Sequence, residues 1–154
     1  MFLKLGGLPL APGFLPPGSQ TQLTFPDYAK ADRAGTHRAL RAIAQTLADY
    51  VLLLREAGAD GLVYVVANTT STLGDSYWEF AAPYDHIALD GAAGIPRIVH
   101  TCGAQAHPQW FEDFPLEGIN WDTFEPTNPG PDALTKKVFV GGVSAELLGG
   151  LRPD

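Results

Sequence analysis

The chain has few cysteines, few basic residues and no long apolar run, and each shortage excludes a class of protein. Its 154 residues include one cysteine, which rules out an internal disulfide and, with no export signal visible, favours a reducing cytoplasm. Ten basic residues against 17 acidic ones give a formal net charge of −7, which argues against a nucleic-acid surface. Glycines and prolines interrupt the apolar N-terminal stretch, so we expect no membrane span. The sequence thus predicts a cytoplasmic protein without nucleic-acid or membrane partners.

The residues that are present suit one globular domain, because 45% are hydrophobic and 18% are charged. Residues 1–30 are rich in proline and glycine, and we expect them to form an irregular lead-in. Residues 31–57 then predict a long helix that ends before Gly58, a typical helix-terminating residue. Its expected core face is a stripe of apolar residues at helical spacing, namely Leu40, Ile43, Ala44, Leu47, Val51 and Leu54.

Apolar, β-branched runs at residues 61–67, 96–102, 118–122 and 138–143 predict four strands. Helical sequence separates them: residues 75–93, with a kink near Pro83, and short segments at 108–113 and 132–137. This alternation indicates an α/β fold of right-handed βαβ units with parallel strands. A full (βα)8 TIM barrel needs about 250 residues, so residues 31–154 predict about half of one.

Four parallel strands cannot close a barrel, so the predicted sheet has two unpaired edges and an apolar face that is poorly covered. We therefore expect the isolated chain to pair with a second copy, as a homodimer, or with a complementary barrel half. It is not expected to be a well-behaved active monomer.

Polar side chains follow two of the predicted strands. His100 and Cys102 lie two residues apart, so they point to the same face at the carboxyl end of their strand, where α/β folds build active sites. Cys102 is then a free thiol, a metal ligand or a buried small hydrophobe. Asn120 and Asp122 point together at the end of the next strand, with Trp121 on the opposite face. They indicate either pocket chemistry or, for Asp122, a cap on the following turn.

Other polar residues carry weaker signals. Asn68 to Thr70 are best explained as ordinary loop sequence, and Gly141 and Gly142 permit either a close ligand or a turn. Asp85 and His86 lie either on a plain helix surface or near a site, and we expect a solvent-exposed or capping role for His107, which precedes a proline. Glycine-rich phosphate motifs and the nucleophile elbow of hydrolases are missing.

Five segments of the chain, in this order and spacing, resemble the uroporphyrinogen decarboxylase superfamily, which includes cobalamin-linked and coenzyme M methyltransferases. They are "REAGADGLVYVVA", "YWEFAAPYDHIALDGA", "IVHTCG", "GINWD" and "VFVGGV", and together they span residues 55–143. The resemblance implies a (βα)8 barrel. It also implies a tetrapyrrole or corrinoid-linked substrate at the carboxyl ends of the strands.

In the methyltransferase branch, the His and Cys of an H-x-C-G motif bind zinc, which activates a substrate thiol. The resemblance therefore implies that His100 and Cys102 bind zinc as a cofactor. That branch takes a further cysteine from a late strand, and this chain has no second one. The decarboxylases depend on an early arginine-rich segment, which has no equivalent here either.

Tyr84 and Asp85 match a family segment near the pocket rim. We therefore predict Tyr84 as catalytic, together with Asn120 and Asp122 at the strand end. Three functions follow from the resemblance. H-x-C-G favours zinc-dependent thiol methyl transfer, and the family name points to uroporphyrinogen decarboxylation in porphyrin biosynthesis. The two missing features favour a third, a non-catalytic half-barrel binding module.

Overall fold

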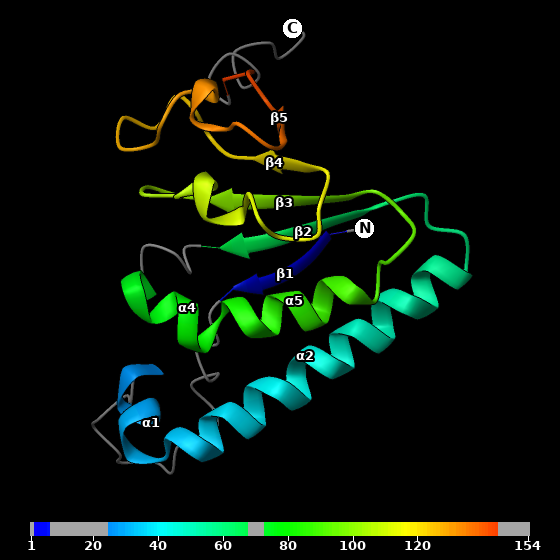
Figure 1. Cartoon of the computed structure of the whole chain (residues 1–154), viewed down its shortest axis with the longest axis vertical. Helices are drawn as coiled ribbons and strands as arrows, with labels where there is room; N and C mark the ends of the chain where they lie inside the picture. The colour runs from blue at the N-terminus through cyan, green and yellow to red at the C-terminus, as the bar shows by residue number, and fades with distance from the viewer. Residues whose placement is uncertain (1, 7–24, 68–72, 145–154) are drawn as a thin grey trace, which may run out of the picture.

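The computed structural model describes residues 2–6, 25–67 and 73–144, which form an α/β fold around one parallel sheet (Figure 1). The loop residues Asn68 to Thr70 lie outside the described part. In chain order the elements are β1 (Phe2–Gly6), α1 (Phe25–Ala31), α2 (Arg33–Glu56), β2 (Leu62–Ala67), η1 (Gly74–Ser76), α4 (Tyr77–Phe80), α5 (Ala82–Asp90), β3 (Arg97–Cys102), η2 (Pro108–Phe111), β4 (Gly118–Asn120), η3 (Pro131–Ala133) and β5 (Val138–Val140).

The strands lie side by side in the order β1-β2-β3-β4-β5, and every neighbouring pair is parallel. The four predicted strands are confirmed, but β4 and β5 end at Asn120 and Val140, earlier than expected. After β5, Gly141 and Gly142 take φ values of 152° and 103°, which favour glycine and leave the strand conformation. The described sheet is open, with β1 and β5 at its edges, and pairing with another chain stays a prediction.

The N-terminal stretch differs from the irregular lead-in that we expected. Residues 2–6 form a strand that pairs with β2 along its whole length, from Phe2 opposite Val63 to Gly6 opposite Ala67. Residues 25–31 form the short helix α1. Five residues are a common strand length, so they suffice for an edge strand. The prolines that obscured the strand signal come only after these residues.

The long helix α2 is confirmed to within two residues at either end. The Asp32 carboxylate accepts a hydrogen bond from the backbone N–H of Gly35 at 2.7 Å, and this N-cap starts the helix. Gly58, at φ 97°, follows its end as predicted.

The second predicted helix is divided into η1, α4 and α5, with a break at Ala81 just before Pro83. This break confirms the predicted kink, because a helix tolerates proline only in its first turn. The prediction of a short helix at residues 132–137 is wrong. Only the turn η3 forms there, since Leu134 already has extended backbone angles.

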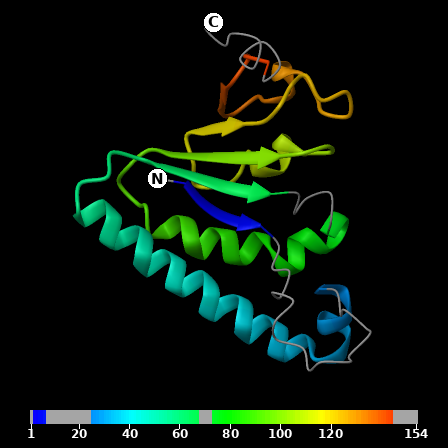
Figure 2. The same cartoon turned by 180° about the vertical axis from the view of Figure 1, so that it is seen from behind.

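Helix α2 packs against α5, and Figures 1 and 2 show the two side by side along one side of the sheet. Small residues permit the close approach: a side chain at Gly91 would come within 2.2 Å of the carbonyl oxygen of Ala48. Ala44, Ala48 and Val51 are the buried face of α2. Ile43, expected in that face, is instead 36% exposed.

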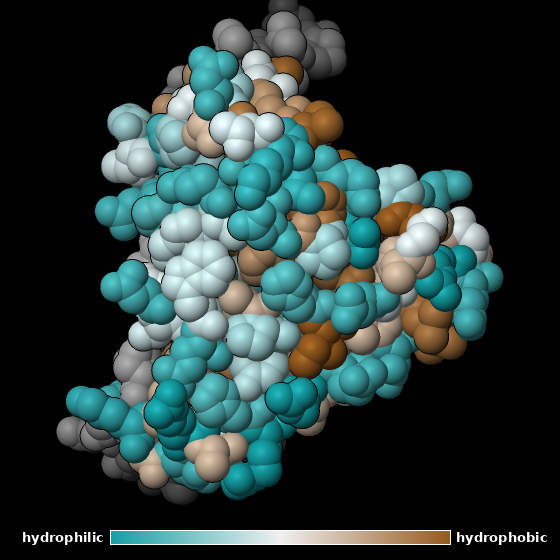
Figure 3. All heavy atoms as spheres, in the orientation of Figure 1, coloured by the Kyte–Doolittle hydropathy of each residue, from teal (hydrophilic) through white to brown (hydrophobic). Residues whose placement is uncertain are grey.

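The hydrophobic core lies between strands β2 to β4 and the segments α4, α5 and η2. Along β3, Val99 and Thr101 are fully buried toward this core, so the alternating His100 and Cys102 lie on the opposite face, where both are half-buried. The face of the molecule seen in Figure 3 is mainly hydrophilic, with separate apolar patches. Within the described segments, no helix has the length and apolar character that crossing a membrane requires.

Candidate functional site at the carboxyl edge of the sheet

A row of hydrogen bonds crosses the carboxyl edge of β3, β4 and β5. The register places His100 opposite Asn120, and Asn120 opposite Val140, so all three residues lie at the same level of the sheet. His100 Nδ1 is hydrogen-bonded to Asn120 Oδ1, and Asn120 Nδ2 donates to the backbone carbonyl of Val140. The structure therefore joins two predicted site residues, His100 and Asn120, by a direct contact.

A cavity of about 200 Å³ lies beside this row at the strand ends. Asp122, predicted as a site residue, lines it and also accepts a hydrogen bond at 2.8 Å from the backbone N–H of Phe124. Both expected roles of Asp122, in the pocket and in the turn, are thus combined in one residue. The cavity lining is formed by His100, Asn120, Trp121, Asp122, Thr123, Phe124, Gly141, Gly142 and Val143.

A larger hollow of about 500 Å³ lies elsewhere, between α2 and α5. Exposed residues such as Arg41, Asp49 and Asp90 line this hollow. The row of hydrogen bonds from His100 to Val140 lies on the sheet, away from it. We take the smaller cavity as the candidate site, because polar side chains at strand ends are where α/β folds carry their chemistry.

Cys102 is a free, half-buried cysteine on the same face of β3 as His100, but it does not line the cavity. Its partial exposure excludes the buried-hydrophobe interpretation and leaves a thiol or a metal ligand. In the part of the chain that the structure describes, no three His, Cys, Asp or Glu side chains gather to hold a metal ion. Zinc needs four ligands, so His100 and Cys102 supply at most half of a site.

Asn128 holds the two loops that follow β3 and β4, and sequence reasoning missed it. Its Nδ2 donates to the carbonyls of Gly103 at 3.0 Å and Asp122 at 2.9 Å, and its Oδ1 accepts from the N–H of Ala106 at 2.9 Å. The loop "EPTNPGP" signals a turn but not its partners, which lie up to 25 residues away.

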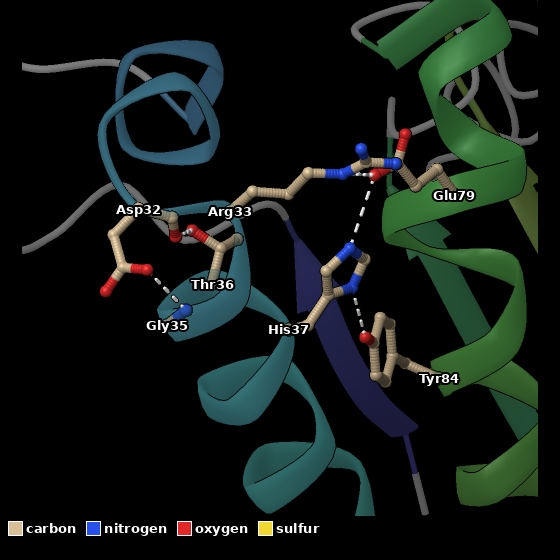
Figure 4. A network of polar contacts seen from close by, with 7 residues as sticks. All are labelled: Asp32, Arg33, Gly35, Thr36, His37, Glu79 and Tyr84. Carbon is tan, nitrogen blue, oxygen red and sulfur yellow. Dashed lines mark hydrogen bonds and ion pairs between the residues drawn. The ribbon is translucent and has the colours of Figure 1, made fainter.

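Tyr84, predicted as catalytic, lies in the helical layer and is not part of the cavity lining. Figure 4 shows its hydroxyl bound to Nδ1 of His37 on α2, at 2.6 Å. The other ring nitrogen of His37 contacts Glu79 on α4 at 3.2 Å, and Arg33 binds the same Glu79 oxygen at 2.5 Å. The hydrogen bond from Arg33 is the largest cause that lowers the pKa of Glu79, followed by that from His37.

Asp85 lies on the buried face of α5, so the plain helix surface that we considered for it is wrong. Its Oδ1 accepts a hydrogen bond from the Tyr64 hydroxyl at 2.6 Å, and its Oδ2 accepts one from the Tyr77 hydroxyl at 2.8 Å. Burial raises the pKa of Asp85 to about 6, although the two hydrogen bonds oppose this rise. Burial and the neighbouring Asp85 charge also raise the pKa of Tyr64.

The two remaining histidines stack on aromatic rings. The ring centres of His86 and Phe114 are 4.1 Å apart, and those of His107 and Trp110 are 4.5 Å apart. His107 adopts a left-handed φ of 45°, and its side chain makes no capping hydrogen bond. Of the two roles that we expected, capping is thus not seen, and the half-buried ring stacks on Trp110 instead of standing free in solvent.

Comparison with known families gives a match that covers most of the chain. Residues 17–153 match the model described as uroporphyrinogen decarboxylase (URO-D). Comparisons with individual curated proteins and with solved structures gave no match.

Proposed function

This chain belongs to the uroporphyrinogen decarboxylase family, and we propose that it acts on a tetrapyrrole or corrinoid-linked substrate at the carboxyl edge of its sheet. The observation that carries the proposal is the row from His100 to Asn120 beside a cavity of about 200 Å³. Polar side chains that project from strand ends into a cavity are typical of substrate sites in parallel α/β folds.

Within the family, we propose zinc-dependent thiol methyl transfer, with His100 and Cys102 as two of the ligands. Zinc, when bound, would lower the pKa of a substrate thiol and make it a nucleophile toward a methyl group. His100 would hold the ion through a ring nitrogen and Cys102 through its sulfur, both from the same face of β3. The remaining ligands would be the substrate thiol and either water or a residue outside the described segments.

Since the described residues bring no third metal ligand to His100 and Cys102, a second candidate is uroporphyrinogen decarboxylation. In that reaction a carboxylate leaves as carbon dioxide and a proton takes its place on carbon. His100 and Asp122, which both line the cavity, are the groups that could hold that proton.

The deciding experiment titrates the full chain with Co²⁺ in place of zinc and records the thiolate-to-cobalt absorption band. We expect one equivalent to bind, and both Cys102→Ser and His100→Ala to abolish the band. His37→Ala is the matched control and keeps it, because His37 lies in the helical layer.

A wild-type chain without the band, or a band that persists in Cys102→Ser, contradicts methyl transfer on this zinc site. Turnover of uroporphyrinogen without metal then indicates decarboxylation. Binding of that tetrapyrrole without turnover indicates a non-catalytic half-barrel module.

A further inference from the structure

We infer that Asn120 is a positioning residue, which holds the proton of the His100 ring on Nδ1 and leaves Nε2 as the accepting nitrogen. The asparagine amide has one donor group, Nδ2, and one acceptor, Oδ1. The backbone carbonyl of Val140 can only accept, so Nδ2 of Asn120 must face it. Oδ1 is then the atom that faces His100.

The orientation of the amide decides which ring nitrogen carries the proton. Oδ1 cannot donate, so the hydrogen bond to His100 requires a proton on Nδ1. A neutral imidazole has one N–H, and therefore Nε2 keeps its lone pair. Among the described residues, Nε2 of His100 has no hydrogen-bond partner, and His100 lines the cavity.

The register of three strands maintains this arrangement. His100, Asn120 and Val140 occupy the same level of β3, β4 and β5, so backbone hydrogen bonds of the sheet fix the distances between them. The amide also restrains rotation of the ring, as partners behind a metal-binding or proton-accepting histidine commonly do. The inference rests on the proposed function only for what Nε2 binds, a metal ion or a substrate proton.

The test uses the metal-free, ¹⁵N-labelled full chain at alkaline pH, where imidazoles are neutral. Long-range ¹H–¹⁵N correlation spectra distinguish the two tautomers of each ring. We expect the Nδ1–H form for His100 in the wild type, and a shift toward Nε2–H in Asn120→Ala. Asn120→Asp should restore Nδ1–H and move that proton downfield, since a carboxylate accepts a stronger hydrogen bond.

His37, His86 and His107 are internal controls in the same spectra, and their patterns should not change. An Nε2–H form of His100 in the wild type overturns the inference, as does an unchanged pattern in Asn120→Ala. If Asn120→Ala does not fold, the wild type and Asn120→Asp still decide, because an unmoved Nδ1 proton in Asn120→Asp also overturns it. The measurement needs no metal, so its failure is distinguishable from a failed Co²⁺ titration.

Discussion

The helical layer and the carboxyl edge of the sheet contain similar polar side chains but differ in how fully these are bound. In the helical layer, His37 has a partner on each ring nitrogen, and Asp85 accepts a hydroxyl on each oxygen. At the sheet edge, His100 has a partner among the described residues only on Nδ1, and Cys102 is a free cysteine. A histidine with both nitrogens occupied stabilises the packing around it. One with a free nitrogen beside a cavity can bind a ligand or accept a proton.

The largest effect should come from Asp85, where ionisation costs stability. Its pKa of about 6 in the folded chain exceeds the ordinary value of 3.8, so the folded state binds more protons between these values. The Asp85 contribution is therefore fully present below about pH 4 and is lost as the pH rises through 6, by about 3 kcal/mol. Asp85→Asn, which is neutral at every pH, should remove this dependence.

Urea unfolding between pH 4 and pH 7 measures this dependence as the difference in the free energy of unfolding between the wild type and Asp85→Asn. Relative to the wild type, Asp85→Asn should gain stability as the pH rises. Exposed carboxylates such as Glu117, whose pKa is lowered mainly by a hydrogen bond from the Arg97 backbone, act in the opposite direction but cancel in the comparison. A constant difference across this range would show that folding does not raise the pKa of Asp85.

Replacing one histidine in each region should separate stability from binding. His37→Ala removes two hydrogen bonds and the stacking on Phe80, whose ring centre is 5.0 Å away, so we expect a loss of about 2 kcal/mol. His100→Ala removes one hydrogen bond at a half-buried position and should cost about 1 kcal/mol or less. Only His100→Ala should abolish Co²⁺ binding. The reverse pattern would remove the distinction between the two regions.

The sequence predicted elements well where the signal is local. The spacing of apolar residues placed α2, β2 and β3, and strand alternation correctly put His100 and Cys102 on one face. The lead-in strand β1 was missed because its pairing with β2 joins residues about 60 positions apart. A five-residue run gives no periodic signal strong enough to outweigh the prolines that follow it.

The candidate site was predicted by residue but not by contact. His100, Asn120 and Asp122 do line one cavity, since strand ends in a parallel sheet share an edge. Which atoms meet depends on the register of β3 and β4, which the sequence does not state. The partners of Tyr84 were unforeseen for the same reason, because His37 comes from a helix 47 residues away.

Tyr84→Phe tests whether Tyr84 belongs to the helical layer or to the chemistry. The change removes the hydroxyl that binds His37 and should lower the free energy of unfolding by about 1 kcal/mol. We expect Co²⁺ binding to be unchanged, because Tyr84 does not line the cavity. Loss of binding or turnover in a stable Tyr84→Phe chain would instead support the catalytic role that the family resemblance implies.

The smallest effect should come from Arg33, the most exposed member of the network in Figure 4. Its side chain is 68% exposed, and water and salt screen its ion pair with Glu79. Arg33→Ala should therefore leave the urea midpoint almost unchanged at physiological salt.

The pKa of Glu79 should nevertheless rise toward its ordinary value in Arg33→Ala, because Arg33 is the main cause that lowers it, while His37 keeps part of the effect. An NMR titration of the Glu79 carboxyl carbon measures this rise, and Arg38→Ala, which pairs with Asp32 instead, is the matched control. A clear stability loss in Arg33→Ala would mean that the ion pair, and not the part-buried contact with Tyr84, holds His37 in place.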